Sequence, residues 1–325
     1  MRKPGKQKKY TTMKKREARN FYIYTAPWLI GFLVLTLYPI LYSFYLMFTN
    51  MNLTGIGEFV GLDNWKYAFT DDTLFRRAFL NTLKYVFMFV PCSIILAFFV
   101  ALLLSKKVKG LGFFRTAFYI PYITSGVAVT ILWGWIFQKD FGIINYILSL
   151  VGIKGPNWLG DKNVAMISIV ILSLWTIGNN IIIMLAGIQD IPQSYYESAQ
   201  IDGAGSLRQT FYITLPLCTP TIYFNLIVTV IAAFQVFQQP LILTNGGPLN
   251  STYTAAMHLY NNGFLYGKMG YASMMAWSMF AVIMLITIVV VYPHLNSGCF
   301  MMIKRRRDKI CVQDHKKRQS KWQGY

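Results

Sequence analysis

Six long stretches of the chain are almost free of charged residues. They cover residues 21–48, 80–104, 117–138, 164–187, 217–244 and 270–292, and the one Asp, Glu, Lys or Arg among them is Lys84. Each stretch has the roughly 20 mainly apolar residues that an α-helix needs to cross about 30 Å of hydrocarbon. The pattern predicts an all-α membrane protein with six transmembrane helices. The first stretch is too long for the core of a signal peptide and is kept as a span.

The remaining charge supports this assignment and orients it. Of the 325 residues, 55% are hydrophobic and 13% charged, against about 25% charged in soluble domains. Segments 1–20 and 304–321 each hold nine Lys or Arg, residues 106–115 hold four, and the loop between the fourth and fifth spans holds Arg208. These groups all fall on one side of a six-span topology, so the positive-inside rule predicts that both termini are cytoplasmic.

The net charge of +19 is compatible with nucleic-acid binding, but its location argues otherwise. The charges lie in tails and loops beside the spans, where anionic lipid and membrane orientation account for them. We therefore expect a membrane-lipid partner and no nucleic acid. The four cysteines and three histidines are scattered, without the spacing of a metal site or a disulfide framework. No metal, resident cofactor or catalytic site is expected, and the chain is predicted not to be an enzyme.

Prolines and polar loops add local detail. Several spans carry proline, among them Pro39, Pro91, Pro121, Pro220 and Pro240, which predicts kinked helices around an aqueous path or simple packing irregularity. In the loop after the first span, Asp71 and Asp72 are expected to cap a short helix. The basic segment 1–20 is expected to be a disordered cytoplasmic end, residues 21–292 one membrane domain, and residues 293–325 a basic cytoplasmic tail.

The loop between the fourth and fifth spans, residues 188–217, has a different character. Pro192 suits the first turn of a short helix, and Gly203 can take the left-handed conformation that ends it. A second helix is expected to begin at Ser206, with Gln209 completing a capping box. The loop carries three carboxylates but Arg208 as its one basic residue. An amphipathic hairpin lying on lipid headgroups would need Lys and Arg, so this loop is predicted to meet a protein.

The same loop carries a spaced motif. The motif begins with Glu197-Ser198-Ala199, continues after three residues with Gly203, and ends after nine more with Ile213-x-Leu215-Pro216. Ser198 is its one departure from the pattern described next. At these positions the chain resembles the permease subunits of binding-protein-dependent ABC importers, whose loop has Glu-Ala-Ala, three residues, Gly, nine residues and Ile-x-Leu-Pro. Segments 26–32, 59–65, 113–116 and 243–248 resemble the maltose and glycerol-3-phosphate permeases within that family, and the resemblance covers residues 21 to about 285.

The resemblance implies a set of partners. It implies a second, similar permease subunit, two ATPase subunits that bind the ATP, and an extracytoplasmic solute-binding protein, all at a bacterial-type cell membrane. It also implies that the loop couples the permease to the ATPase through Glu197, with Asp202 as an additional contact of our own choosing. The chain has no Gly-x-x-x-x-Gly-Lys-Ser/Thr phosphate loop, so it is not the ATPase. The basic tail from residue 293 departs from the family.

Polar residues within the last three spans are candidates for the solute path or for interhelical contacts. Sugars suit aromatic faces combined with amide groups, and Trp175 and Asn179 are one helical turn apart. The candidates are Trp175, Asn179 and Asn180 on the fourth span, Asn225, Thr229, Gln235 and Gln238 on the fifth, and Ser273 and Trp277 on the sixth. These spans hold no Lys or Arg to neutralise an anionic substrate, which favours a neutral solute.

The function expected from these observations is therefore the permease subunit of an ATP-driven importer for a sugar or oligosaccharide. Two alternatives are kept. The first is an importer permease for a non-sugar solute. The second is a secondary transporter or channel, which predicts intramembrane carboxylates or inverted repeats, and the sequence shows neither.

Overall fold

The computed structural model describes residues 5–106 and 110–296, and the side chains of residues 16–106 and 110–290. The helices before the fourth span are α1 (Gly5–Gly31), η1 (Phe32–Leu37), α2 (Tyr38–Leu46), α3 (Asp63–Thr70), α4 (Thr73–Ser105), α5 (Leu111–Ile123), α6 (Gly126–Ile136) and α7 (Ile143–Leu150). They are followed by α8 (Ala165–Trp175), α9 (Gly178–Gln189), α10 (Gln193–Ile201), α11 (Ser206–Gln209), η2 (Thr210–Thr214) and α12 (Leu215–Leu217). The last are α13 (Thr219–Phe234), α14 (Gln238–Thr244), α15 (Ala255–Tyr260), η3 (Asn261–Leu265) and α16 (Met269–Asn296). The described residues include two isolated bridge pairs but no strand, so the all-α prediction is confirmed.

Three membrane-length helices are continuous and three candidate spans are bent. Residues 16–46, 73–105 and 269–290 are long and apolar enough to cross a bilayer. The pairs α5–α6, α8–α9 and α11/α12–α13 meet the same test only when each pair counts as one span, and they bend by 98°, 49° and 66°. Counted in this way, the described residues contain the six crossings that the sequence predicts. The third, fourth and fifth predicted spans are thus bent pairs of helices.

Proline predicts only part of this bending. The 98° bend follows Pro121 by a few residues, and the 66° bend directly precedes Pro220. In contrast, α4 runs through Pro91 as one helix. The break between α8 and α9, at Thr176 and Ile177, contains no proline at all. The predicted fifth span also ends early, at Phe234. The Val236 carbonyl has no helical N–H partner at Pro240 and accepts a 2.8 Å hydrogen bond from the Thr254 hydroxyl.

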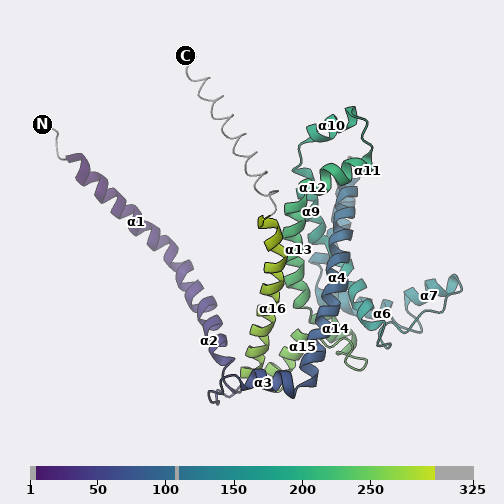
Figure 1. Ribbon diagram of the computed structural model, residues 1–325, viewed down its shortest axis with the longest axis horizontal. Helices are drawn as coiled ribbons and strands as arrows, with labels where there is room; N and C mark the ends of the chain where they lie inside the picture. The colour runs from purple at the N-terminus through teal and green to yellow at the C-terminus, as the bar shows by residue number, and fades with distance from the viewer. Residues whose placement is uncertain (1–4, 107–109, 297–325) are drawn as a thin grey trace. The chain divides into compact units, whose positions relative to one another are not determined.

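The chain divides into two compact units, residues 1–71 with 259–277 and residues 72–258 with 278–325. In the larger unit, α4 packs along both α9 and α13, and these three helices hold most of the apolar core. Met184, Phe234 and Ile169 are almost completely buried there. Figure 1 shows α10 and α11 at one end of this bundle and α14 at the other. Helices α4, α9 and α13 therefore form most of the core, and the polar loop and the helix breaks lie around them.

The smaller unit is built on different contacts. The Trp277 indole donates a 3.2 Å hydrogen bond to the Ser43 hydroxyl and meets the Phe44 ring edge-on at 5.0 Å. Tyr67 on α3 packs edge-on against Tyr271. In this unit, α1 is helical from Gly5 onward, so residues 5–20 differ from the disordered end that the sequence predicts; residues 1–4 lie outside the described residues. The many Lys, Arg, Gln and Glu residues of this segment are good helix formers. Residues 297–325 of the predicted tail lie outside the described residues.

The first turn of α4 shows how an external loop is held. The Asp72 carboxylate accepts hydrogen bonds from the backbone N–H groups of Leu74 and Phe75, so it is the predicted cap, but of a 33-residue helix rather than a short one. Its second oxygen lies 2.9 Å from Nε2 of His258 on α15. Burial lowers the pKa of His258, while the neighbouring Asp72 charge opposes this effect. The contact ties α15 to the start of α4.

Close packing of α9 on α5 depends on Gly178. A Cβ at this position would lie 2.5 Å from the Phe118 carbonyl oxygen, whereas a Cβ at Gly112 on α5 would meet nothing within 4 Å. We expect Gly178→Ala to destabilise the protein by about 1–3 kcal/mol because the helices must separate. Gly112→Ala should be neutral or stabilising, since alanine is the better helix former. Thermal unfolding in detergent measures both; equal midpoints for the two variants would contradict the close approach.

Candidate functional site

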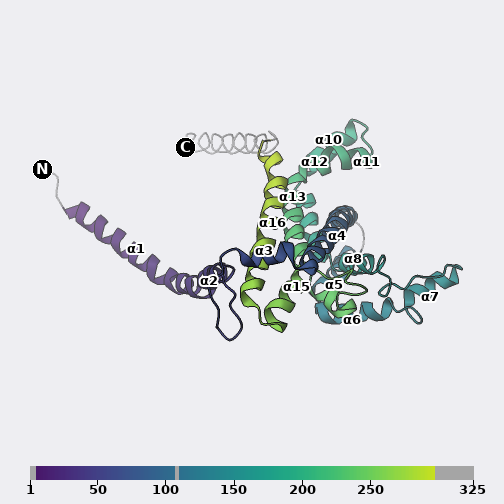
Figure 2. The same cartoon turned by 60° about the horizontal axis from the view of Figure 1, so that its bottom comes forward.

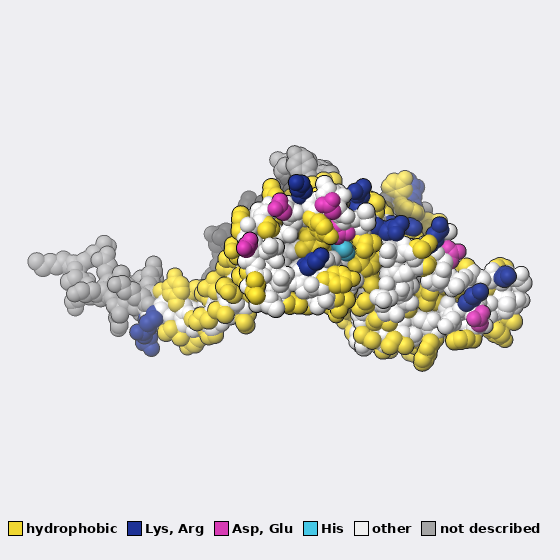
Figure 3. Space-filling model, turned by 90° about the horizontal axis from the view of Figure 1, so that it is seen from below, with side chains coloured by type: hydrophobic (Ala, Val, Ile, Leu, Met, Phe, Trp, Pro, Cys, Tyr) yellow, Lys and Arg dark blue, Asp and Glu magenta, His cyan; other side chains and the backbone are white. Residues whose placement is uncertain are grey.

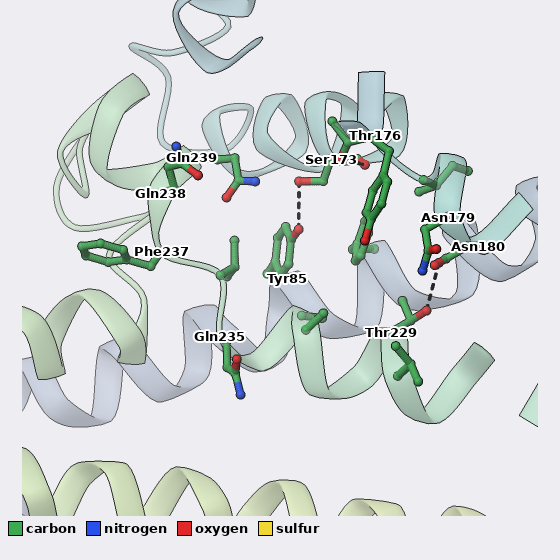
Figure 4. A pocket seen from close by; sticks show the side chains of 17 residues that line it. Tyr85, Ser173, Thr176, Asn179, Asn180, Thr229, Gln235, Phe237, Gln238 and Gln239 are labelled. Carbon is green, nitrogen blue, oxygen red and sulfur yellow. Dashed lines mark hydrogen bonds between the residues drawn. The ribbon is translucent and has the colours of Figure 1, made fainter. Parts of the chain in front are cut away.

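A polar cavity of about 470 Å³ lies in the larger unit, where two spans are interrupted. One wall is the break between α8 and α9, and another is the segment between α13 and α14. Figure 4 shows these side chains around the opening. The lining residues are Tyr85, Phe89, Tyr122, Ser173, Thr176, Ile177, Asn179, Asn180, Val228, Thr229, Ala232, Ala233, Gln235, Val236, Phe237, Gln238 and Gln239. Interrupted helices lining a cavity are the usual place for solute sites in membrane transporters.

Several of the polar groups hold helices together. The Asn180 amide on α9 donates a 2.9 Å hydrogen bond to the Thr229 hydroxyl on α13, which in turn donates to the Asn225 carbonyl at 2.6 Å. The Asn225 amide returns a 2.9 Å hydrogen bond to the Asn180 carbonyl. On the other side of the cavity, the Tyr85 hydroxyl donates to Ser173 Oγ at 2.8 Å. These two sets of hydrogen bonds join α4 to α8 and α9 to α13 and hold the cavity walls.

Four amide side chains that line the cavity are available to a ligand. Within the described part of the chain, the side chains of Asn179, Gln235, Gln238 and Gln239 make no hydrogen bond. In Figure 4 the Gln239 amide points toward the Tyr85–Ser173 pair, and that of Gln235 points away from it. Each amide offers two donors and one acceptor oxygen. Together with the tyrosine and phenylalanine rings, they form a surface suited to hydroxyl-rich molecules.

The cavity lining is uncharged. Its 17 residues include no Asp, Glu, Lys, Arg or His. Among the described residues no cluster of three or more His, Cys, Asp or Glu is placed to hold a metal ion. A carboxylate or phosphate bound here would therefore lack a compensating positive charge, and burying an unpaired charge is costly. The electrostatics favour a neutral, polar ligand.

The structure brings together some of the predicted path residues and separates others. Asn179, Asn180, Thr229, Gln235 and Gln238 all line the cavity. Asn225 is fully buried beneath it and acts in the interhelical network.

Trp175 belongs to a second cavity of about 540 Å³, whose lining is almost wholly apolar and includes Trp133, Phe118 and Leu96. Trp277 and Ser273 lie in the smaller unit, and neither is among the described residues that line the polar cavity. The prediction that Trp175 and Asn179 share a helix face was wrong because α8 ends at Trp175 and α9 begins at Gly178. Spacing of one turn loses its meaning across a helix break.

Sequence reasoning missed Tyr85, Phe89, Tyr122 and Gln239 in the cavity. The first three lie on the second and third spans, which the search for path residues did not include. Tyr85 and Phe89 are four residues apart on α4, and their rings stack at 5.4 Å. The same span also carries Phe87, Phe98 and Phe99, so the sequence offered little to single out this pair.

The loop of residues 188–217 forms two short helices joined by a tight turn. Helix α10 ends in a complete Schellman motif: Gly203 N–H donates to the Gln200 carbonyl at 3.0 Å, and Ala204 N–H to the Ala199 carbonyl at 2.8 Å. Gly203 has φ of +76°, so its predicted role as a left-handed helix stop is observed. The predicted capping box is absent: Gly205 caps α11, and the Gln209 amide donates to the Ala204 carbonyl instead.

The loop is anchored on one side and exposed on the other. The Tyr196 hydroxyl lies 2.9 Å from that of Thr214, Leu215 packs against the core, and Ile213 and Ala199 are half-buried. The side chains of Glu197, Ser198, Asp202 and Pro216 are exposed. The anchored residues fix the angle of the loop, and the exposed ones make its outer face.

That outer face combines acidic and apolar side chains. Ile201 is 87% exposed and Leu207 77% exposed, and they flank the turn that carries Asp202. Exposed large apolar residues grouped with polar ones mark protein-contact surfaces. We call Glu197, Ile201, Asp202 and Leu207 the coupling face. The face has the composition of a docking site for another protein.

The turn at Gly203 provides a direct test of this geometry. A Cβ at Gly203 would meet no atom within 4 Å, so Gly203→Val acts through backbone conformation alone. A β-branched residue held at positive φ costs about 1–3 kcal/mol, and we expect α10 to turn away and the coupling face to lose its shape. Co-purification of the ATPase that the family resemblance implies should fall, while Gly205→Ala, with φ of −67° and equally open space, should behave as wild type. Equal recovery of the ATPase with both variants would refute the role of the turn.

Comparison with known proteins decides the family. Residues 74–294 match the model of the binding-protein-dependent transport system inner membrane component. The chain belongs to this family. The match places the protein in the membrane as a transport component rather than an enzyme, and the predicted family resemblance is confirmed.

Individual relatives cover most of the chain. A probable ABC transporter permease protein, YesP of Bacillus subtilis (strain 168), is 40% identical over 82% of this chain and 88% of its own length. The arabinooligosaccharides transport system permease protein AraP of the same organism is 34% identical over 82% and 86%. The trehalose/maltose transport system permease protein MalF of Thermococcus litoralis is 32% identical over 89% and 96%. These relatives are permeases of solute transport systems.

The fold also matches solved structures. A chain in the crystal structure of a bacterial ABC transporter involved in the import of the acidic polysaccharide alginate superposes with a TM-score of 0.75, covering 86% of this chain and 97% of that one at 22% sequence identity. A chain in the complex of the alginate transporter with its pentasaccharide-bound periplasmic protein gives 0.71. At this identity the likeness establishes the fold.

Proposed function

We propose that this chain is the permease subunit of an ATP-driven importer for a neutral sugar or oligosaccharide, and that the polar cavity is its solute site. The observation that supports this most strongly is the uncharged cavity with four unbonded amides and stacked aromatic rings at two helix breaks. The arabinooligosaccharide and trehalose/maltose systems of the relatives support a carbohydrate. The solute would be selected jointly with a second permease and a solute-binding protein.

The coupling face is proposed as the contact with the ATPase. Its motif residue Glu197 is exposed, and the Schellman turn at Gly203 together with the Tyr196–Thr214 hydrogen bond holds it in a fixed position. A rigidly held loop can transmit movement of the ATPase to the membrane helices, whereas a flexible loop would absorb it. Two ATPase subunits, one for each permease, complete this proposal.

We further propose that α10 and α11 face the cytoplasm, with both chain termini on the same side. The distribution of Lys and Arg supports this orientation. Membership of the family of binding-protein-dependent permeases supports a second, similar permease subunit. The proposed assembly is therefore a heterodimer of permeases.

The test is reconstitution of the chain with its partner permease, ATPase and binding protein in vesicles. Uptake of radiolabelled neutral sugars should require ATP and the binding protein together. An assembly that hydrolyses ATP in response to its binding protein but carries only charged or amino-acid solutes would overturn the substrate class. Uptake that continues without ATP would overturn the importer mechanism.

A further inference from the structure

Helix α7 presents an apolar face that has no partner within the described residues. Ile143, Tyr146, Ile147 and Leu150 follow a helical repeat, and Val151 comes directly after; all five side chains are between 54% and 72% exposed. We define the α7 arm as residues 139–163. Figure 2 shows α7 extending away from the helix bundle beyond α6.

The arm is fixed in this orientation by one asparagine on its other side. The Asn145 amide donates to the carbonyls of Lys139 at 2.9 Å and Pro156 at 3.2 Å, and its oxygen accepts a 2.7 Å hydrogen bond from the Trp158 indole. A Cβ at Gly155 would lie 1.9 Å from the Asn145 oxygen, so the loop closes tightly over this side chain. The hydrogen bonds of Asn145 therefore hold the apolar face of α7 in its outward orientation.

The arm also carries positive charge beside a cavity. A cavity of about 770 Å³ is lined by Lys139 and Lys154 together with Asn145, Tyr146 and Ser149, by the apolar residues Phe141, Ile143 and Ile153, by Gly155, and by one carboxylate, Asp140. In Figure 3 the right-hand end of the surface, where α7 lies, has yellow side chains along its edge and blue and magenta ones beside them. A basic and hydroxyl-lined hollow bordered by aliphatic side chains fits an anionic amphiphile.

The position along the chain places this arm at a membrane boundary. The end of α4 and the coupling loop share one cavity, lined by Ser105 and Tyr196 among others, and the bent pair α5–α6 that follows is long and apolar enough to be one span. The arm follows at the opposite end. Trp135, Leu132 and Ile131 on α6 are 46–68% exposed, so an apolar surface leads from the span toward α7.

We propose that the α7 arm lies along the membrane surface at the end opposite the coupling loop. Its apolar face enters the acyl region, and Lys139 and Lys154 bind the phosphate of an anionic phospholipid. The four aliphatic side chains of the face suit acyl chains, whereas protein interfaces are enriched in Arg, Met and aromatic residues. The proposal needs a bilayer around the spans but does not depend on the substrate of the transporter.

Photocrosslinking in the assembled transporter tests which molecule covers the face. The complex would be reconstituted in nanodiscs of phosphatidylcholine and phosphatidylglycerol in equal amounts, with Ile147→p-benzoylphenylalanine on the apolar face. The matched control is Lys162→p-benzoylphenylalanine, at an exposed position of the same arm outside the apolar face and the cavity lining. Mass spectrometry should find phospholipid adducts at position 147, several times more than at 162. Adducts to the partner permease or the binding protein, equal lipid adducts at both positions, or none at 147 would overturn the proposal.

The head-group part has its own readout. With the probe at position 147, phosphatidylglycerol should dominate the adducts, and Lys139→Gln and Lys154→Gln should each lower its excess over phosphatidylcholine by about fivefold. Lys162→Gln serves as the charge-matched control and should leave the ratio unchanged. Recovery of the assembled complex shows that each variant has folded. A lipid ratio insensitive to Lys139 and Lys154, or an equally large change with Lys162→Gln, would refute phosphate binding in the cavity.

Discussion

Glu197→Lys is expected to abolish solute-stimulated ATP hydrolysis while leaving membrane insertion and permease assembly intact. Glu197 is exposed on α10 and makes no contact with the core, so its replacement leaves the spans undisturbed. Reversing a charge at a protein interface costs about 2 kcal/mol or more when the partner charge becomes unpaired, which corresponds to at least about a thirtyfold loss. The measurement is ATP hydrolysis by the reconstituted complex with and without loaded binding protein.

The matched control is Ser194→Lys, which adds a positive charge one turn earlier on the same exposed helix. It should retain at least most of the stimulated activity, because Ser194 lies outside the coupling face. If both variants lose activity alike, general electrostatic repulsion and not a Glu197 contact is responsible. Full stimulated activity in Glu197→Lys would remove the residue from the ATPase contact.

Asn179→Leu is expected to reduce sugar uptake by about 5-fold to 150-fold, because one lost hydrogen bond to a buried polar ligand costs about 1–3 kcal/mol. The Asn179 amide lines the cavity and makes no hydrogen bond within the described part of the protein. Its replacement therefore removes a ligand contact without breaking an interhelical one. Basal ATP hydrolysis and the thermal midpoint of the complex should remain close to those of the wild type.

The neighbouring Asn180 gives the opposite expectation. Its amide on α9 donates a hydrogen bond to the Thr229 hydroxyl on α13, so Asn180→Leu should lower the thermal midpoint of the complex in detergent. Any loss of uptake should follow the loss of folded protein. Uptake and thermal unfolding measured side by side separate the two roles. If Asn179→Leu loses stability while the remaining complex transports normally, Asn179 is an interhelical residue and not part of the solute site.

The coupling loop was largely predictable because its structure is local. The helix stop at Gly203 follows from the backbone freedom of glycine, and the short helices follow from their length and flanking residues. The detail that failed, the capping box at Ser206, was a choice between two nearby partners for Gln209. Such choices depend on the exact path of the turn, which spacing alone does not specify.

The solute cavity was less predictable because it arises at helix breaks. The sequence between Trp175 and Gly178 contains no proline and no polar run to announce the 49° bend there. That bend places Asn179 in the polar cavity and Trp175 in the apolar one. Amide residues were correctly singled out as candidates by their chemistry, but the grouping of residues from four spans required the three-dimensional structure.

The most direct test of the central claim is ATP-dependent uptake by the reconstituted transporter from pairs of oligosaccharides of equal length, one neutral and one carrying uronic acid carboxylates. Because the cavity lining is uncharged, we expect uptake of the neutral member of a pair and little or none of the acidic one. The loaded binding protein must be shown to hold both members. Preferential uptake of the acidic oligosaccharide would contradict the assignment of the cavity as the site of a neutral sugar.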